Sequence, residues 1–427
     1  MTTPAPVPAP TPGSAGQRGP LSHRPFAWYW LARVATTIAA QIQVVAVGWQ
    51  MYELTGSALA LGLVGLVQFA PSALLLFGVG PVVDRFDRRR ILIICRLIEG
   101  TAALCLAIAS HQGWLDRNLI FGFVFLIGAS RAFDMPAAQA LLPSLVPPEI
   151  LSRAVALSSS AHQAATIVGP AIGGLLYVAG PQVVYATSGT LFLLAAGLLS
   201  MVRARRIDPP RQRVSMQYLF AGITFIRRHP VLLGAISLDM FAVLLGGATA
   251  LLPIYAKDIL HTGPWGLGLL RSAPAVGALA VAVFLSRRPL DRRVGRLLLG
   301  AVAVFGLATL VFAVSHWLAL TLAALTLLGA SDMISVVIRM SLVQLGTPDD
   351  MRGRVGAVNS LFIGASNQIG EFESGVTAAW FGAVPSVIIG GIGTLLVVLI
   401  WARVFPELAR RDRMVPRDRT GPQRGGP

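Results

Sequence analysis

Twelve apolar runs, each close to the length of a bilayer-spanning helix, dominate this chain. A helix that crosses the hydrocarbon core of a membrane needs roughly 20 consecutive, mostly apolar residues. Hydrophobic residues make up 55% of the sequence and charged residues only 13%, which excludes an ordinary soluble domain. The expected spans are residues 27–51, 59–81, 90–110, 119–138, 154–178, 183–202, 231–255, 264–285, 297–315, 317–341, 355–380 and 384–404.

The runs divide into two sets of six that resemble each other. Such an internal repeat is typical of transporters in which substrate binds near the midplane, between two halves that rock over it. We therefore expect an all-α membrane protein with two pseudo-symmetric six-helix bundles, residues 26–202 and 231–405. A shift of 201 residues without a gap superimposes identical residues of the two sets: Arg153 on Arg354, Gly169 on Gly370, and Gly174 on Gly375.

Three segments lie outside the spans. Residues 1–25 alternate proline with small residues and contain no apolar core of signal-peptide length, which predicts a disordered arm. Residues 203–230 are first charged and proline-rich and then amphipathic, which predicts a linker that ends in an interfacial helix. Residues 406–427 are rich in arginine and predict a disordered basic tail.

The basic residues predict the orientation of the chain. When Arg90 and Arg403, at the ends of spans, are counted with the adjoining loops, 28 of the 35 Lys and Arg residues lie on one side of the expected membrane, 2 lie on the other side and 5 lie within spans. Because positive residues accumulate on the cytoplasmic side, both termini are expected in the cytoplasm. The basic clusters also attract anionic lipid. No folded basic module suits nucleic acid, so we expect none as a partner.

Three motifs resemble the major facilitator superfamily. After the second span, "GPVVDRFDRRR" is similar to its loop signature Gly-x-x-x-Asp-Arg-x-x-Arg-Arg, and "RAFD" in span four contains an arginine, Arg131, similar to the superfamily's span-four arginine. In span five, "GPAIGG" resembles the end of the antiporter signature, although Ala156 and Ala165 replace its two upstream glycines. The matching residues are Gly80, Asp84, Arg85, Arg88 and Arg89 in the loop, and Gly169, Pro170, Gly173 and Gly174 in span five.

Other segments resemble one branch of the superfamily. The runs "DMPAAQALLPSLVPPEILSRAVAL", "GRVGAVNS" and "GEFESG" are most similar to the transmembrane secretion effectors, which include enterobactin and macrolide exporters. The resemblance covers residues 26–405. It implies the major facilitator fold, a bacterial inner-membrane location and proton-coupled efflux of amphipathic small molecules. We expect the chain to act as a monomer.

The loop after span two is expected to act as a conformational latch. Asp84 follows a helix end, where it would cap a neighbouring helix N-terminus or pair with an arginine. Arg88 is placed within reach of Asp134, near the inner end of span four. Simple anchoring of a basic loop on the cytoplasmic side is the alternative, but it gives no reason for Gly80 or for Asp84.

Spans three and four contain charges at matching depths. Because the two helices are antiparallel, Arg131 is expected opposite Glu99, and Arg96 opposite Asp134, as a structural ladder. In the competing interpretation, Arg131 faces a central cavity and binds an anionic group of the substrate or controls a proton carrier. The repeat superimposes Arg131 on Asp332, so these two residues would also be able to pair across the halves.

Glu371 and Glu373 stand inside the eleventh apolar run. An ionised side chain at the centre of a bilayer costs about 2.5–3.5 kcal/mol on insertion scales, so such residues persist mainly where they have a role. Burial favours the protonated form of a carboxyl group, which suits a reversible proton carrier. Hydrogen bonding to neighbouring helices is the alternative. Further candidates for substrate or proton coupling are Asp239, Asp332 and Arg33.

Motifs of other chemistry are missing from the sequence. There is no Walker sequence, no His-x-x-x-His or Cys-x-x-Cys pair and no Gly-x-Ser-x-Gly elbow. We therefore expect no enzyme, no cofactor and no metal centre. Export, import by the same fold, and a non-transporting membrane receptor are the three functions considered, and export accounts for the most features.

Overall fold

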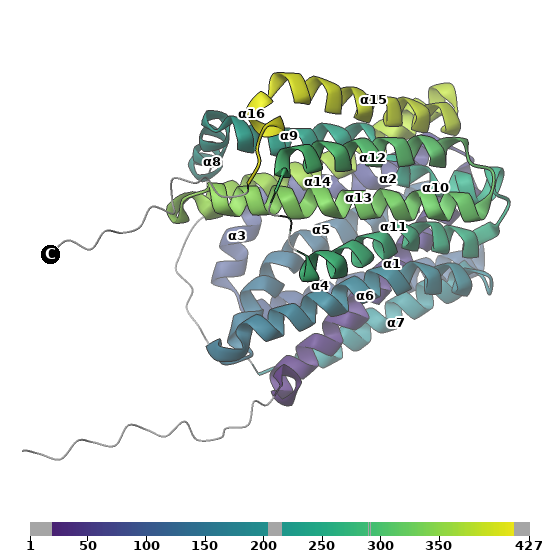
Figure 1. Ribbon diagram of the computed structural model, residues 1–427. Helices are drawn as coiled ribbons and strands as arrows, with labels where there is room; N and C mark the ends of the chain where they lie inside the picture. Colours follow the sequence, from purple (N-terminus) through teal and green to yellow (C-terminus); the bar gives the residue numbers. More distant parts are fainter. Residues whose placement is uncertain (1–18, 204–215, 289, 291, 414–427) are drawn as a thin grey trace, which may run out of the picture.

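The computed structural model describes residues 19–203, 216–288, 290 and 292–413, and every regular element among them is helical (Figure 1). Twelve long helical segments form two bundles of six. The N-terminal bundle contains α1 (Arg24–Thr55), α2 (Ala58–Leu74) followed by α3 (Leu76–Arg85), α4 (Arg88–Gln112), α5 (Arg117–Leu141), α6 (Leu151–Tyr177) and α7 (Pro181–Ser200).

The C-terminal bundle repeats this plan after the helix α8 (Met216–Arg228). Its first segment is broken and includes a π-helical turn, η5. The segments are α9 (Pro230–Leu245) with η4 (Ala248–Leu251), α10 (Leu252–Ile254) and η5 (Tyr255–Ile259), then α11 (Gly263–Arg287), α12 (Val294–Val314), α13 (Leu318–Gly346), α14 (Asp349–Phe381) and α15 (Ala383–Val404).

Two of the twelve expected spans stand out as polar. Among the described residues, nine helices are long and apolar enough to cross a membrane, and α2 with residues 78–85 adds a tenth if the bent pair is counted as one span. The remaining two, α6 and α14, have 27 and 33 residues and are long enough but less apolar. Both pack across the molecule, α6 along α11 and α14 along α2. They face protein on these sides, which explains their polar composition.

Glycines allow these two cross-bundle contacts to be close. A β-carbon on Gly375 of α14 would lie 2.7 Å from the Cα of Gly62, and one on Gly174 of α6 would lie 3.0 Å from the Cα of Gly268. Small residues let helix backbones approach each other. Gly174 and Gly375 are superimposed by the sequence repeat, so the two seams between the bundles are pseudo-equivalent.

Among the described residues, buried apolar packing joins the bundles at one end and not at the other. The cluster at the end where α1 finishes contains Trp49 together with Leu251 and Phe312, and therefore residues from both bundles. At the other end the clusters are separate, one around Phe26 in the N-terminal bundle and one around Leu238 in the C-terminal bundle. We call the end at Thr55 closed, because one apolar cluster spans both bundles there, and the end where α1 begins divided, because each bundle has its own cluster.

The chain is ordered further toward both ends than expected. Pro20–Ser22 form a short 3₁₀ helix directly before α1. The predicted disordered tail does not begin at Pro406, because α16 (Pro406–Ala409) packs on the C-terminal bundle and buries Leu408. The Gly295 amide also donates to the Arg411 carbonyl over 2.9 Å. Residues 1–18, 204–215 and 414–427 of the predicted arm, linker and tail lie outside the described residues.

Candidate functional site

A cavity of about 210 Å³ lies between the two bundles. Helices α1, α2 and α5 line it from the N-terminal side, and η4, α11 and α14 line it from the C-terminal side. Its apolar walls include Val47, Leu61 and Ile127. Its polar side chains are Gln43, Gln68, Arg131, Arg271, Gln368 and Glu371. We call it the central cavity.

Two charged side chains of the C-terminal bundle reach across this cavity. The carboxylate of Glu371 lies over Gly65 of α2, where a β-carbon would come within 2.6 Å of Oε2. The guanidinium of Arg271 lies over Gly48 of α1, where a β-carbon would be 3.4 Å from Nη2. The glycines of the N-terminal bundle therefore provide the space for these charges, which attract each other within one cavity.

Several polar atoms around the central cavity are unsatisfied. Gln43 is 3% exposed, and among the described residues neither its side-chain oxygen nor its nitrogen has a hydrogen-bond partner. Oε1 of Gln368 and Nε of Arg271 are in the same condition. A buried polar group without a partner costs about 1–3 kcal/mol. Water or a polar ligand in the cavity would complete these hydrogen bonds.

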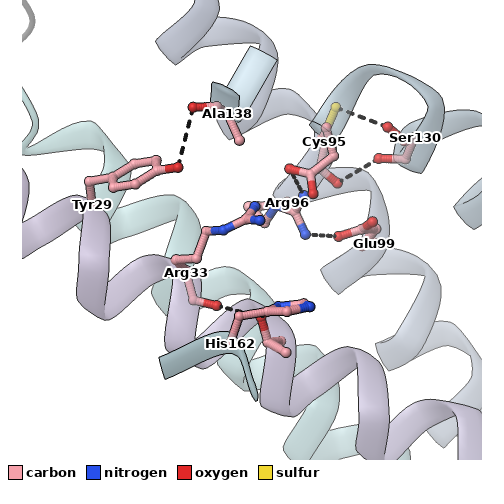
Figure 2. Close-up of polar contacts among 10 residues, drawn as sticks. Tyr29, Arg33, Cys95, Arg96, Glu99, Ser130, Ala138 and His162 are labelled. Atoms are coloured by element: carbon pink, nitrogen blue, oxygen red, sulfur yellow. Dashed lines mark hydrogen bonds and ion pairs between the residues drawn. The ribbon is translucent and has the colours of Figure 1, made fainter. Parts of the chain in front are cut away.

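The charge ladder between α4 and α5 is only partly as expected. Arg96 does form an ion pair with Asp134. Glu99 also pairs with Arg96 (Figure 2), and among the described residues no ion pair joins Glu99 to Arg131. Arg96 and Glu99 are both on α4, three residues apart, so they meet on one helix face. Arg131 is left to line the central cavity. Among the described residues, no ion pair joins it to Asp332, which lines a different cavity.

Hydrogen bonds around Arg96 hold α1, α4 and α5 together (Figure 2). The Tyr29 hydroxyl donates to the Ala138 carbonyl over 3.3 Å. Cys95 Sγ donates to the Ser130 carbonyl over 3.4 Å, and Ser130 Oγ donates back to the Cys95 carbonyl over 3.1 Å. This part of the N-terminal bundle is a structural cluster.

Arg33, a candidate for substrate or proton coupling, does not line the central cavity. It lies instead on a small cavity beside the same cluster, together with Arg96 and Asp134. Its position near the start of α1 places it toward the divided end of the molecule, away from the central cavity.

The two glutamates of α14 have different surroundings. Glu373 accepts a hydrogen bond of 2.8 Å from the hydroxyl of Thr377, one turn further along the same helix. It does not line the central cavity, whereas Glu371 does. Asp239 also lies elsewhere, because it forms a buried ion pair with Arg339 of α13. Sequence reasoning did not single out Arg339, and a lone arginine in an apolar run was the only available signal.

The loop signature does not form the expected latch contacts in this structure. Asp84 is exposed and forms no ion pair among the described residues. Arg88 does not reach Asp134 as expected, and its Nη1 donates to the Ala140 carbonyl over 3.3 Å. The reason is geometric, since residue 140 lies six positions beyond Asp134, about 9 Å along α5, and Arg96 already occupies the carboxylate.

Helix ends explain the remaining contacts of this loop. Arg89 Nε donates to the Leu199 carbonyl over 2.9 Å at the end of α7, where a positive charge is favourable. The N-terminus of α4 is capped by Asp87, whose carboxylate accepts from the Arg89 amide over 2.9 Å. The capping role expected of Asp84 is therefore taken by Asp87, and the arginines bind within the N-terminal bundle.

The antiporter-like signature forms a tight seam of three helices. A β-carbon on Gly169 would lie 2.5 Å from Cβ of Gln41, and one on Gly173 would lie 3.0 Å from Cα of Ile42, so α6 is pressed against α1. On a neighbouring face of α6, the Pro170 carbonyl lies against Gly268 of α11. The signature therefore links α1 to the C-terminal bundle.

Comparisons with known proteins cover nearly the whole chain. A family profile described as transmembrane secretion effector matches residues 15–423. The enterobactin exporter EntS of Citrobacter koseri is 27% identical over 401 residues, which are 92% of this chain and 95% of that protein. Macrolide efflux protein A of Streptococcus pyogenes is 27% identical over 267 residues, which are 60% of this chain and only 64% of that protein.

Solved structures share the fold. A bacterial homologue of the human lysosomal transporter Spinster, in an inward-facing and unoccupied conformation, superimposes with a TM-score of 0.69 at 14% identity and covers 93% of this chain and 98% of its own. A bacterial homologue of the iron transporter ferroportin, in an inward-facing state, gives a TM-score of 0.68 at 19% identity, with coverages of 91% and 99%.

Proposed function

Because the chain belongs to the transmembrane secretion effectors of the major facilitator superfamily, we propose that it is a proton-coupled exporter of amphipathic small molecules that works by alternating access. The family and the fold are those of transporters and not of enzymes. The relatives are named for the export of enterobactin, a siderophore, and of macrolides. Molecules of these kinds are the substrates that we propose for this chain.

The central cavity is the observation that carries this proposal. It lies between two pseudo-equivalent bundles, and both bundles contribute charged side chains, Arg131 from one and Arg271 and Glu371 from the other. Its mixture of apolar walls and unpaired polar atoms suits an amphipathic molecule. Closure of the bundles at one end and division at the other is what an alternating-access transporter requires of one state.

Glu371 is the proposed proton carrier. Its carboxylate lies at the seam of α2 and α14, where the two bundles meet, so a change in its charge acts directly on the contact between them. Proton binding also changes how strongly Glu371 holds Arg271 across the cavity. We further propose that the loop signature latches the cytoplasmic end in the opposite state, and that both termini are cytoplasmic, in a bacterial inner membrane.

The test compares Glu371→Gln with Glu373→Gln in proteoliposomes. Glutamine keeps the size of glutamate but cannot carry a proton, so Glu371→Gln should lose efflux driven by a proton gradient and keep substrate exchange, which needs no gradient. Glu373→Gln is the matched control on the same helix and should keep both activities. Full gradient-driven efflux by Glu371→Gln would refute its role as the carrier.

The direction of transport is measured in inside-out vesicles. An exporter accumulates substrate in such vesicles when their interior is acidified, because the vesicle lumen corresponds to the outside of the cell. Accumulation in right-side-out vesicles alone would show that the chain is an importer of the same fold. Enterobactin and a macrolide are the first two substrates to test.

A further inference from the structure

A second cavity, of about 290 Å³, lies within the C-terminal bundle. Residues of α9, η4, α10, α11, α12, α13 and α14 line it, and it shares no lining residue with the central cavity, although η4, α11 and α14 contribute to both. The two cavities take neighbouring residues of these elements: Asn367 faces this one, while Gln368 faces the central cavity. Its volume is near the lower end of the range of about 300–1,000 Å³ for small-molecule pockets.

The lining of this cavity has a single charge. Asp332 is the only ionisable residue among the side chains that line it, and no ion pair neutralises it in the described part of the chain. The rings of Phe305 and Phe312 also line the cavity, and aromatic faces attract cations. Most of the other lining residues are apolar, among them Leu325 and Leu328. A carboxylate and phenyl rings in an apolar setting favour a lipophilic cation.

The charged groups next to Asp332 do not disturb this preference. A small cavity beside the larger one is lined by Asp332 and by Asp239 of α9, and Asp239 is paired with Arg339. This neighbouring pair is therefore neutral overall. By contrast, the central cavity contains two arginines and one glutamate and is positive overall. The two cavities thus have opposite electrostatic character.

We propose that the C-terminal bundle contains a separate binding site for lipophilic monocations, in which the Asp332 carboxylate holds the charged group and the apolar walls with Phe305 and Phe312 hold the body. Binding at this site is independent of the proposed export function, and only a role of the site in export rests on that function. Asn367 also lines the cavity and is exposed, and its amide nitrogen donates to the Ile363 carbonyl.

Binding is tested with two probes of the same shape and opposite charge. Tetraphenylphosphonium and tetraphenylborate both carry four phenyl rings and differ in the sign of their charge. Purified protein in nanodiscs, with empty nanodiscs as the background for partition into lipid, should bind the phosphonium in preference to the borate. Asp332→Asn, which keeps the size of the side chain, should weaken phosphonium binding about tenfold or more. Glu371→Gln should leave it within about twofold.

A pair of bulky substitutions on α11 provides a test that does not alter the charge. Ala278 lines the cavity, so Ala278→Phe should fill part of it and weaken phosphonium binding, while Asp332 remains. Val276, two residues away, is 44% exposed and does not line the cavity, so Val276→Phe is the matched control and should bind normally. Equal binding by both variants would overturn the proposal, as would equal binding of phosphonium and borate.

Protons should compete with the cation for Asp332. The phosphonium has no titratable group, so a weakening of its binding at low pH that disappears in Asp332→Asn reports protonation of this carboxylate. The Asp239–Arg339 ion pair is the other charged group beside Asp332. The helices α11, α12 and α14 line the cavity with side chains that do not titrate, among them Pro274, Phe305 and Asn367. Phosphonium binding that weakens in Glu371→Gln and not in Asp332→Asn would place the cation in the central cavity. None of these equilibrium measurements requires transport, so their failure is distinct from failure of gradient-driven efflux.

Discussion

At the scale of single residues, the charges of this protein divide into those that hold the bundles together and those that face a cavity. Arg96 lies between two carboxylates at 2% exposure, and Arg339 is paired with Asp239 at 3% exposure. Arg131 and Arg271, in contrast, have no ion pair among the described residues and line the central cavity. Sequence position alone does not separate the two groups, because all four stand in apolar runs.

Removal of Arg96 should destabilise the fold more than removal of Arg131. Arg96→Met leaves Glu99, which is 1% exposed, without its partner, and the loss of one member of a buried ion pair costs about 3–5 kcal/mol. We expect a lower melting temperature and a lower yield of monodisperse protein in detergent. Arg131→Met is the matched control and should lose transport while it keeps most of its thermal stability. Equal stability of the two variants would contradict the structural role of Arg96.

At the scale of helices, α6 and α14 are pseudo-equivalent, and the repeat in the sequence predicted their correspondence. It did not predict which faces they use. Gly174 and Gly375 approach helices of the opposite bundle, because each lies where two backbones nearly touch. The sequence does not show which residue a glycine contacts, so only the folded structure identifies Gly268 and Gly62 as the residues across the two seams.

The α2–α14 seam should not tolerate a side chain at Gly375. In Gly375→Val the β-carbon would lie 2.7 Å from the Cα of Gly62, which is closer than van der Waals contact, so the two helices must separate. We expect loss of transport and a lower melting temperature. Gly364→Val on the same helix meets no atom within 4 Å and has the same change in helix propensity. If both variants transport equally well, close packing at this seam is not required.

The segment α3 and the loop that follows it should matter in the state opposite to the one described here. Asp84 is exposed where the bundles are divided, so the latch has no partner to bind in this conformation. Asp84→Asn should therefore increase the inward-open population and reduce transport without loss of expression. A cysteine at Gln68 in the central cavity, in a variant without Cys95 and Cys105, measures this as faster labelling from the cytoplasmic side.

The control for the latch is another exposed acid at the same end. Glu149→Gln removes one charge from the loop before α6 and lies outside the signature, so its labelling rate should match that of the parent protein. Unchanged labelling and full transport in Asp84→Asn would leave the loop with a role in topology only.

At the scale of the whole molecule, the sequence was sufficient for the architecture. Runs of apolar residues predicted twelve helical segments in two bundles, because the length of a span is set by the membrane and not by tertiary contacts. The central cavity was less predictable. Arg131 and Glu371 were identified because charge is costly in a span, whereas Gln43 and Gln368 were not, since a lone amide costs less and has no periodic pattern.

Closure of the molecule at the Thr55 end of α1 was not revealed by the sequence. The Tyr52 hydroxyl donates a hydrogen bond to Asp258 of η5, and the Lys257 ammonium lies 5.5 Å from the centre of the Tyr52 ring. Both contacts join the two bundles. Charge asymmetry predicts that this end faces the outside of the cell, so these contacts must break when the transporter opens outward.

A cross-link between Tyr52→Cys and Asp258→Cys should therefore trap the state described here. In a variant without Cys95 and Cys105, a cleavable, membrane-impermeant bifunctional maleimide added to intact cells should join the two cysteines, because residue 258 is exposed and lies at the end that is predicted to face the outside of the cell. Substrate should still bind from the cytoplasmic side, but transport should stop and return when the linker is cleaved. The single Tyr52→Cys variant treated with the same reagent should transport normally. Full transport by the cross-linked protein would mean that the bundles need not separate at this end, and reaction only from the cytoplasmic side would reverse the predicted orientation.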